Sequence, residues 1–443
     1  MIMEDLKRWK DKKRRKPLLL TGVRQCGKTY ILRQFAEECF EDSAYFNFDS
    51  SDALASVFSY DFNIKRILQE LEIINEGKKI TPGKTLVIFD EVQACSRAIT
   101  SLKYFCENLP DLHLIAAGSL LGVALRDDGV SFPVGKVDRM EMYPMTFSEF
   151  VCTDGGENIF NGLDMTDLKR ELPSLYTVPM EKYLKNYYIV GGMPEAVQVW
   201  VETHDYRQVE EVQDQILKDY PDDFGKHLPK DRNPAQMVMT LQAIWDSVPA
   251  QIARDNNKFI FSHVKKGARS KDLEDALQWL MSAGLVYRLH LVEAPEIPLS
   301  GMADAAYFKV YMADVGLLRR KAGLSYRTIL EGSELFIRFK GALAENYVME
   351  ELKAMGFQPF FWRTKTNAEI DFVVENDGMV IPIEVKSADN TKAKSLHSFC
   401  NRYEPETAVK TSLKNVGDNM DGKTQVWSIP LYALFKLRKY LES

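Results

Sequence analysis

The chain lacks any apolar run long enough to cross a membrane. Its longest runs, such as LVIF at 86–89, have the length of a β-strand, whereas a membrane-spanning helix needs about 20 apolar residues. The basic stretch 7–16 is followed only by PLLL before Thr21-Gly22, so it has no apolar signal-peptide core. We therefore expect a cytoplasmic protein without membrane contact.

Paired cysteines and a strong net charge are also missing. The six cysteines, at 26, 39, 95, 106, 152 and 400, show no Cys-x-x-Cys spacing, so we expect reduced thiols. The net charge of −6 creates no global attraction to nucleic acid, and any such contact would need a local basic patch. A chain of 443 residues with 45% hydrophobic content predicts an ordinary globular protein of roughly two to four domains.

The stretch GVRQCGKT at 22–29 matches the phosphate-binding pattern G-x-x-x-x-G-K-[ST] in full. An apolar strand at 17–20 precedes it, and a helix with Ile31, Leu32 and Phe35 on one face follows it. Glycines let backbone N–H groups curl round a phosphate at a helix N-terminus, where the helix dipole favours negative charge. The alternative is a chance glycine-rich turn, which the flanking strand and helix disfavour.

This loop predicts ATP and Mg²⁺ as cofactors. Lys28 is expected to reach the β and γ phosphates, and the Thr29 hydroxyl is expected to ligate Mg²⁺. The residues expected to contact the nucleotide are Gly22, Val23, Arg24, Gln25, Cys26, Gly27, Lys28, Thr29, Tyr30 and Ser119.

A second apolar strand, TLVIFDEVQ at 85–93, ends in two acids, as expected of a buried parallel strand that carries carboxylates at its end. Asp90 is expected to hold Mg²⁺, directly or through water. Glu91 is expected to polarise the attacking water as a general base, a step worth roughly 10²–10⁴-fold. A third strand within 112–122 leads to Ser119, which senses the γ phosphate, positions the attacking water or has no role. Ordinary acids at a strand end are the alternative for Asp90 and Glu91.

These strands, together with SFPVGKVDRMEMYPMTFSEF at 131–150, resemble a broad family of bacterial and archaeal AAA-type ATPases with an uncharacterised C-terminal region. YYIVGGMPEAV at 187–197 and ILKDYPDDFGKH at 216–227 extend the resemblance over nearly the whole chain. The resemblance implies a P-loop AAA-type fold and ATP hydrolysis, and it allows a homo-oligomer.

The resemblance also implies that an arginine from a neighbouring subunit or a moving lid completes the site. Arg126 and Arg139, on either side of the SFPVGKV stretch, are the candidates, and Lys136 offers a further positive charge. Ordinary exposed arginines are the alternative.

The middle of the chain reads as helical. Apolar residues recur at helical spacing through 155–230, with a break at 191–194, GGMP. A helical lid over the nucleotide is the expected role of 155–232. The acidic residues Asp219, Asp222 and Asp223 are expected to form a solvated helix end rather than a metal site.

Residues 233–300 predict three helices and a strand-rich tail, an order that suits a winged helix and resembles the corresponding region of the family. Ser270 is the expected N-cap of the third helix. Four basic residues near its start are candidates for phosphate contact: Lys265, Lys266, Arg269 and Lys271. The acids of the same helix, Asp272, Glu274 and Asp275, would repel a phosphate backbone. We therefore favour a wing that packs on protein over a DNA reader.

A hairpin, AEIDFVVENDGMVIPIEVKS, occupies residues 368–387. A two-residue turn at Asp377-Gly378 pairs the flanking residues and places Asp371 opposite Glu384. Cβ atoms of such a pair lie about 4.5–5.5 Å apart, close enough to share one cation. Pro382 leaves the register uncertain by one residue, and a one-residue slip would separate the two acids.

Glu384 and Lys386 are two residues apart and project from one face of the strand. A divalent metal between Asp371 and Glu384 would activate water, and Lys386 would position or deprotonate that water. An ordinary charged surface hairpin is the alternative.

A helix at 341–356, with Glu345 beside its apolar stripe, and a strand in FQPFFWRT precede the hairpin. Glu345, Asp371 and the Glu-x-Lys at 384–386 resemble the restriction-endonuclease-like PD-(D/E)XK pattern. That resemblance implies a nuclease-like domain acting on or binding DNA or RNA.

The sequence thus predicts an α/β protein of four parts: 1–154, an AAA-type core; 155–232, a helical lid; 233–300, a winged-helix-like region; and 301–443, a restriction-endonuclease-like domain. The expected function is ATP hydrolysis coupled to that domain. The expected catalytic residues are Lys28, Asp90, Glu91, Glu345, Asp371, Glu384 and Lys386, and the expected metal ligands are Thr29, Asp90, Asp371 and Glu384. The alternatives are a nucleotide-driven switch whose C-terminal domain only binds a protein or nucleic-acid partner, and a ring-forming remodelling ATPase.

Overall fold

The computed structural model describes residues 2–50, 52–124, 132–167, 169–226, 228, 233–254, 258–332, 337–364, 368–387 and 394–441. The chain divides into two compact units, each built from three segments. The first unit contains Met1–Tyr143, Asp223–Met239 and Gln278–Leu285, and the second contains Pro144–Asp222, Thr240–Leu277 and Val286–Ser443. The four consecutive parts predicted from the sequence therefore do not match these units, because each unit combines segments from more than one predicted part.

The first unit contains a five-stranded sheet in the order β2-β3-β4-β1-β5, with every pairing parallel. Its strands are β1 Leu18–Gly22, β2 Asp42–Asn47, β3 Thr85–Asp90, β4 His113–Ala117 and β5 Asp138–Met142. The strands predicted at 17–20, within 85–93 and within 112–122 are confirmed. Since parallel strands end at the same edge, the carboxyl ends of β1, β3 and β4 lie next to one another.

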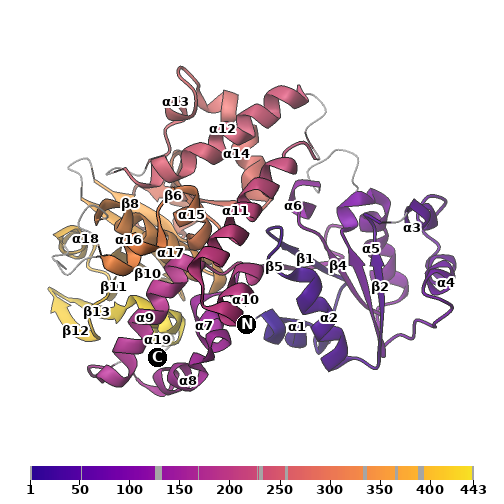
Figure 1. Cartoon of the computed structure of the whole chain (residues 1–443), viewed down its shortest axis with the longest axis horizontal. Helices are drawn as coiled ribbons and strands as arrows, with labels where there is room; N and C mark the ends of the chain where they lie inside the picture. The colour runs from indigo at the N-terminus through magenta and orange to yellow at the C-terminus, as the bar shows by residue number, and fades with distance from the viewer. Residues whose placement is uncertain are drawn as a thin grey trace. The chain divides into compact units, whose positions relative to one another are not determined.

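Helices cover both faces of this sheet (Figure 1). They are α1 Ile2–Lys10, α2 Lys28–Cys39, α3 Asp52–Val57, α4 Ile64–Ile74, α5 Ser96–Asn108 and α6 Leu121–Ala124, with a 3-10 turn η1 at Val92–Ala94. Leu86 and Ile88 of β3 pack with α1 and α2, whereas Val87 and Phe89 pack with α4 and α5. Because successive strand residues point to opposite faces, the uninterrupted apolar run of β3 serves two cores.

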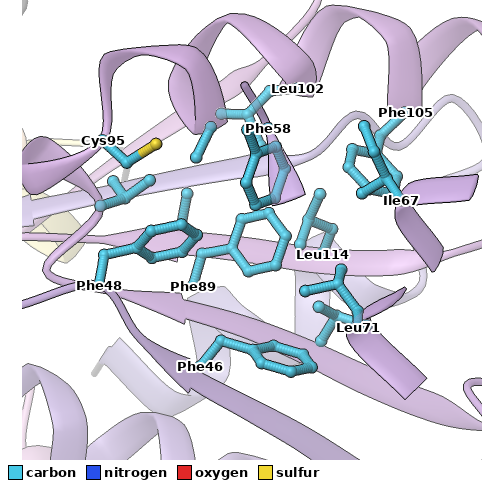
Figure 2. Packing of buried hydrophobic residues seen from close by; sticks show 14 of the residues in the cluster. Phe46, Phe48, Phe58, Ile67, Leu71, Phe89, Cys95, Leu102, Phe105 and Leu114 are labelled. Carbon is cyan, nitrogen blue, oxygen red and sulfur yellow. The ribbon is translucent and has the colours of Figure 1, made fainter. Parts of the chain in front are cut away.

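Phe89 lies in the middle of the core beneath α4 and α5 (Figure 2). Its ring centroid lies 6.1 Å from Phe46, 5.3 Å from Phe48, 5.8 Å from Phe58 and 6.1 Å from Phe105. These rings meet mainly edge to face, the arrangement that aromatic quadrupoles favour. This core supports β3, whose last residue is Asp90.

The second unit contains an eight-stranded mixed sheet in the order β12-β13-β11-β10-β9-β8-β6-β7. Its strands are β6 Val286–Val292, β7 Ala303–Met312, β8 Phe360–Arg363, β9 Glu369–Asn376, β10 Met379–Val385, β11 Thr407–Ser412, β12 Gly417–Asp421 and β13 Thr424–Pro430. The domain boundary expected at residue 300 lies between β6 and β7, which pair as antiparallel neighbours in this sheet.

Helices α17 and α18 pack on the strands of this sheet. The α-helices of the second unit are α7 Phe147–Val151, α8 Glu157–Met165, α9 Ser174–Val190, α10 Pro194–Thr203, α11 Tyr206–Asp222, α13 Phe261–Val264, α15 Val315–Lys321, α16 Tyr326–Glu331, α17 Ile337–Ala354, α18 Lys394–Tyr403 and α19 Leu437–Leu441. Short 3-10 or π turns are η2 Cys152–Gly156, η3 Leu299–Met302 and η5 Leu431–Lys436. Two helices, α12 Pro234–Ile252 and α14 Ser270–Ser282, contain residues of both units. None of the helices in the described ranges is long and apolar enough to cross a membrane.

The helical expectations for the middle of the chain are largely met. The predicted break is confirmed, since α9 ends at Val190 and α10 begins at Pro194. The order α12, α13, α14, β6, β7 also follows the expected three helices and strands, while the winged-helix identity stays a prediction. Ser270 as N-cap is wrong: it is the first helical residue, and Asp272 Oδ2 accepts the N–H of Arg269 at 2.9 Å, which puts Arg269 at the cap.

Candidate functional site

The phosphate-binding loop joins β1 to α2, as the sequence predicted. Lys28 is buried, and its Nζ donates to the carbonyl oxygens of Gly22 at 2.9 Å and Val23 at 2.8 Å. The loop begins where only glycine fits, because a Cβ on Gly22 would lie 2.4 Å from the Met142 carbonyl oxygen. An ammonium group is thus held inside the loop by backbone carbonyls.

Among the described residues, the first turn of α2 has no side-chain cap. Gly27 is the N-cap of this helix, with φ 90°. The backbone N–H groups of that turn therefore remain for a phosphate. Burial raises the pKa of the Cys26 thiol, so this group stays neutral and adds no negative charge to the loop. Tyr30, also predicted to contact the nucleotide, is exposed.

Asp90 lies at the carboxyl end of β3 with its side chain buried. Its Oδ2 accepts hydrogen bonds from Thr29 Oγ1 at 2.7 Å and from the Tyr45 hydroxyl at 2.6 Å. The structure therefore brings together Thr29 and Asp90, the two predicted Mg²⁺ ligands, from segments 61 residues apart.

Tyr45 was not found from the sequence. It lies on β2, which pairs in parallel with β3 so that Asn47 is level with Asp90. Burial and the bond to Asp90 raise the pKa of Tyr45 to about 12, so its hydroxyl stays a donor at neutral pH. No local pattern marks this residue, because its role depends on which strand neighbours β3.

Glu91, the predicted base, follows β3 in the left-handed region at φ 49°. Its carboxylate accepts a hydrogen bond from the Gln93 side-chain amide. Gln93 in turn lies against Gly118, where a Cβ would be 1.9 Å from Gln93 Oε1. Ser119 is half-buried immediately after Gly118. The acid, the amide and the end of β4 thus form one edge of the site, and Gln93 was missed by the sequence reading.

Arg139, one of the two arginine candidates, does not lie at the phosphate end of the sheet. Arg139 is level with Leu19 on the neighbouring strand, three residues before Gly22, or roughly 10 Å at the usual strand rise. Its guanidinium stacks over Phe132 at 4.4 Å. Lys136 pairs with Glu107 at 2.9 Å, and Arg126 lies outside the described residues.

One expectation for the acidic stretch at the end of α11 is wrong. Asp223 is not solvated: its side chain is 6% exposed and pairs with Arg24 of the phosphate-binding loop. A second partner is Lys226, whose Nζ lies 2.8 Å from Asp223 Oδ1.

The C-terminal hairpin has the register that the turn predicts. Met379 pairs with Asn376, and the ladder continues to Ile383 and Phe372. The ladder ends there, and the expected facing of Asp371 and Glu384, one step further along, stays a prediction. Asp371 Oδ2 accepts the backbone N–H of Val385 at 2.7 Å.

Pro382 does not disturb this register. The pairing of β10 with β11 begins one residue later, at Ile383. The missing N–H of Pro382 therefore removes no hydrogen bond from that side of the strand.

A bulge in β9 turns Asp371 away from the α18 core. Between β8 and β9 the register shifts, from Phe360↔Val373 to Trp362↔Ile370. Ile370 and Val373 both lie in the core under α18, although they are three residues apart. β-Bulges commonly redirect a side chain beside a functional site. This bulge places Asp371 on the side of the sheet where the charge of Glu345, on α17, helps to raise the pKa of Asp371.

The predicted acids meet additional charged residues that the sequence reading missed. Lys309 Nζ on β7 lies 2.6 Å from Glu369 and 3.8 Å from Glu345. The Tyr311 hydroxyl donates to Glu345 at 2.8 Å. The alternation of side chains along the strand FKVYM places Lys309 and Tyr311 on the same face. No local sequence pattern shows that this face contacts Glu345.

Burial shapes the charges of this carboxylate cluster. Burial and the nearby Glu384 raise the pKa of Asp371 well above its usual range. For Lys386, burial lowers the pKa, but Glu384 and Asp371 outweigh it and raise the pKa above the ordinary value. Lys386 Nζ lies 2.5 Å from Glu384 Oε1. Lys386 is therefore an ammonium at neutral pH, which favours positioning over proton abstraction.

The carboxylate cluster of Glu345, Glu369, Asp371 and Glu384 could supply a metal ion with ligands mainly from Asp371 and Glu384. Among the described residues no group of three or more His, Cys, Asp or Glu is arranged to hold a metal, and Lys309 engages Glu345 and Glu369. Glu384 Oε2 is buried without a hydrogen-bond partner in the described ranges. Asp371 and Glu384 still match the protein share of a Mg²⁺ site that is completed by water and substrate phosphate.

Comparison with known protein families gives a described family for the N-terminal region only. Residues 14–151 match the AAA domain family. This N-terminal region is AAA-type. Residues 181–328 and 340–434 match two families described as domains of unknown function. The AAA-type region thus contains β1 to β5, Lys28, Thr29, Asp90 and Glu91.

Proteins similar to this chain in sequence or structure include two uncharacterized proteins and one ATPase. An uncharacterized protein of Methanocaldococcus jannaschii is 22% identical over 415 residues, covering 91% of this chain and 82% of that protein. An uncharacterized protein of Mycobacterium tuberculosis is 37% identical over 81 residues, covering 18% and 17%. A Walker-type ATPase of Pyrococcus abyssi aligns with a TM-score of 0.43 at 17% identity, covering 72% of this chain and 94% of that one.

Proposed function

We propose that the chain binds ATP with Mg²⁺ at the phosphate-binding loop and hydrolyses it. The observation that carries this proposal is the 2.7 Å hydrogen bond from Thr29 to Asp90, beside the buried ammonium of Lys28. A P-loop ATPase site needs a hydroxyl and a carboxylate near each other at the end of the loop, and a lysine inside it.

Each residue then has a defined task. Lys28, held by carbonyls of its own loop, would exchange these partners for phosphate oxygens. Thr29 and Asp90 would hold Mg²⁺, which neutralises charge on the phosphates when bound. Glu91 would accept a proton from the attacking water, and Gln93 would orient the Glu91 carboxylate through their hydrogen bond.

ATP turnover by the purified chain tests this proposal. Wild type should release phosphate, Lys28→Ala should lose nucleotide binding, and Glu91→Gln should bind nucleotide but turn over roughly 10²–10⁴-fold more slowly. The exposed residues Glu37 and Lys78 provide the controls Glu37→Gln and Lys78→Ala, which should match wild type. Full turnover in Glu91→Gln would remove the base assignment, and full binding in Lys28→Ala would remove the site.

We further propose a nuclease-like role for the C-terminal region. The gathering of Glu345, Asp371, Glu384 and Lys386 around one bulged hairpin supports it. The sequence of elements α17, β8, β9, β10 also agrees with the helix and three strands expected of a restriction-endonuclease-like domain. The ion pairs of Lys309 favour the competing role, a domain that binds a partner without cleaving it.

A cleavage assay separates the two roles. Single- and double-stranded DNA and RNA are incubated with Mg²⁺ or Mn²⁺ and wild type, Asp371→Ala, Lys386→Ala or the exposed control Lys423→Ala. Cleavage by wild type and the control, lost in the other two, supports a nuclease. Cleavage that survives both site variants refutes the assignment, and none under any condition favours the partner-binding switch.

A further inference from the structure

Two later segments of the chain, Asp223–Met239 and Gln278–Leu285, belong to the first unit, although each follows a stretch that belongs to the second. We call them the returning segments, and both contact the phosphate-binding loop. Asp223 begins the segment Asp223–Met239 and directly follows Asp222, the last residue of α11. Its buried carboxylate pairs with the Arg24 guanidinium. The first residue of this returning segment is therefore tied to the loop by a charge pair.

The other segment, Gln278–Leu285, contacts the neighbouring loop residue. Gly284 lies against the Val23 backbone, since a Cβ on Gly284 would be 3.3 Å from the Val23 nitrogen. Trp279 packs edge to face against Phe224, with ring centroids 5.5 Å apart. The two returning segments thus pack on each other and on two consecutive residues of the loop.

The ion pair between Arg24 and Asp223 would compete with a phosphate ligand for the Arg24 guanidinium. The Arg24 guanidinium is a phosphate-binding group within the loop, but Asp223 engages it already. The Arg24 side chain is 42% exposed and that of Asp223 is 6% exposed, so a ligand can reach the guanidinium more readily than the carboxylate. Phosphate oxygens and the Asp223 carboxylate compete for the same donor, and the two anions repel each other.

We propose that Asp223 is a positioning residue that latches the phosphate-binding loop through Arg24 and is released when the phosphates of a nucleotide take Arg24. The inference rests on the proposed nucleotide binding. Asp223 directly follows the last residue of α11. Release of Asp223 from Arg24 therefore makes the C-terminal end of α11 less constrained. Nucleotide binding thereby acts on the segment between Pro144 and Asp222.

Equilibrium binding of mant-ADP with Mg²⁺ tests the latch. Asp223→Asn keeps the side-chain shape but removes the competing charge, so it should tighten binding about tenfold, or about 1.4 kcal/mol. Arg24→Ala should weaken binding about tenfold, because it removes the phosphate contact along with the latch. The exposed neighbouring acid gives the matched control Asp222→Asn, which should stay within about twofold of wild type.

The order of affinities separates a latch from a structural ion pair. A purely structural pair predicts that Asp223→Asn and Arg24→Ala both weaken binding, and that outcome overturns the proposal. Wild type that does not bind mant-ADP at all refutes the proposed nucleotide site and the latch with it. Wild type that binds while Asp223→Asn does not tighten refutes the latch alone.

Hydrogen exchange on wild type gives a test that needs no variant to fold. Amides in peptides covering residues 216–226 should exchange several-fold faster with mant-ADP and Mg²⁺ than without them. Unchanged or slower exchange there, in protein shown to bind the nucleotide, overturns the proposal.

Discussion

Single buried charges decide much of the local chemistry in this protein. Lys309 is an example, with its ammonium fully buried beside Glu369 and Glu345. Burial lowers the pKa of Lys309, yet Glu345, Glu369 and Asp371 outweigh this and raise it above the ordinary value. The ammonium therefore acts as a resident cation among carboxylates that would otherwise repel one another.

Removing that cation should be costly. Lys309→Met removes the ammonium that lies closest to Glu345 and Glu369, so we expect the free energy of unfolding at pH 7 to fall by about 3–5 kcal/mol. Urea unfolding measures the loss. The exposed pair of Lys84 and Glu41 supplies the control Lys84→Met, which should change stability by less than about 1 kcal/mol. A loss below that level for Lys309→Met would show that the carboxylates do not need Lys309.

At the scale of elements, β3 serves both the core and the site. Its apolar residues anchor it between two helical layers, and Asp90 follows directly after Phe89. A strand held on both faces by packed side chains keeps its final carboxylate in a defined place relative to Thr29.

Truncating the central ring of this core tests that support. Phe89→Ala removes a fully buried side chain and leaves a cavity between four aromatic rings, so we expect a loss of about 3–5 kcal/mol in urea unfolding. Phe89→Leu, which keeps most of the volume, should lose less. Tyr60→Ala, at an 83% exposed aromatic, should be near neutral. Equal losses for Phe89→Ala and Tyr60→Ala would contradict the packing in Figure 2.

The N-terminus of α15 predicts a pH dependence. Asp314 accepts the N–H groups of Leu317 at 2.7 Å and Gly192 at 2.6 Å, and burial raises its pKa from 3.8 to about 6. Between these two values the unfolded chain releases a proton that the folded chain keeps. This group therefore stabilises the fold below about pH 4 relative to neutral pH, and that contribution is lost as pH rises through about 6.

Asp314→Asn isolates this contribution. Asparagine can accept the same N–H groups but does not titrate, so the variant should gain about 2 kcal/mol relative to wild type between pH 4.5 and 7.5. Urea unfolding at the two pH values measures the change. Ser325→Ala removes the uncharged cap of α16 and should cost about 1 kcal/mol at both. A pH-independent difference for Asp314→Asn would show that Asp314 titrates normally.

At the scale of the whole molecule, the first unit gathers three separate segments of the chain. Ligand binding to the AAA-type region should therefore stabilise the returning segments as well as the sheet. A ligand that binds only the folded state stabilises it by about 2.7 kcal/mol at 100 times its Kd.

Calorimetry with ADP and Mg²⁺ measures this effect. At about 100 times the Kd we expect the Tm of one transition to rise by roughly 5–10 °C in wild type and in Lys78→Ala. Lys28→Ala should show no shift. A shift of the same size in Lys28→Ala would show that the nucleotide binds elsewhere.

Local patterns were sufficient for part of the fold and of the site. The loop at 22–29, the strand ending in Asp90 and the Asp377-Gly378 turn are each specified within about ten consecutive residues. Alternation, glycine placement and turn length act over that range, so the register that pairs Asn376 with Met379 followed from sequence alone. The same reasoning placed α2, β3 and the break after α9.

By itself, then, the sequence determined the pattern of the phosphate-binding loop and the turn of the C-terminal hairpin. Only the tertiary structure decided which distant residues complete them: Tyr45 and Gln93 beside the acids, Lys309 among the C-terminal carboxylates, and Asp223 on the loop. Those residues come from other strands and segments. Which of them become neighbours depends on the order of strands in a sheet and on where the chain returns, and these follow from packing the whole chain rather than from any local pattern.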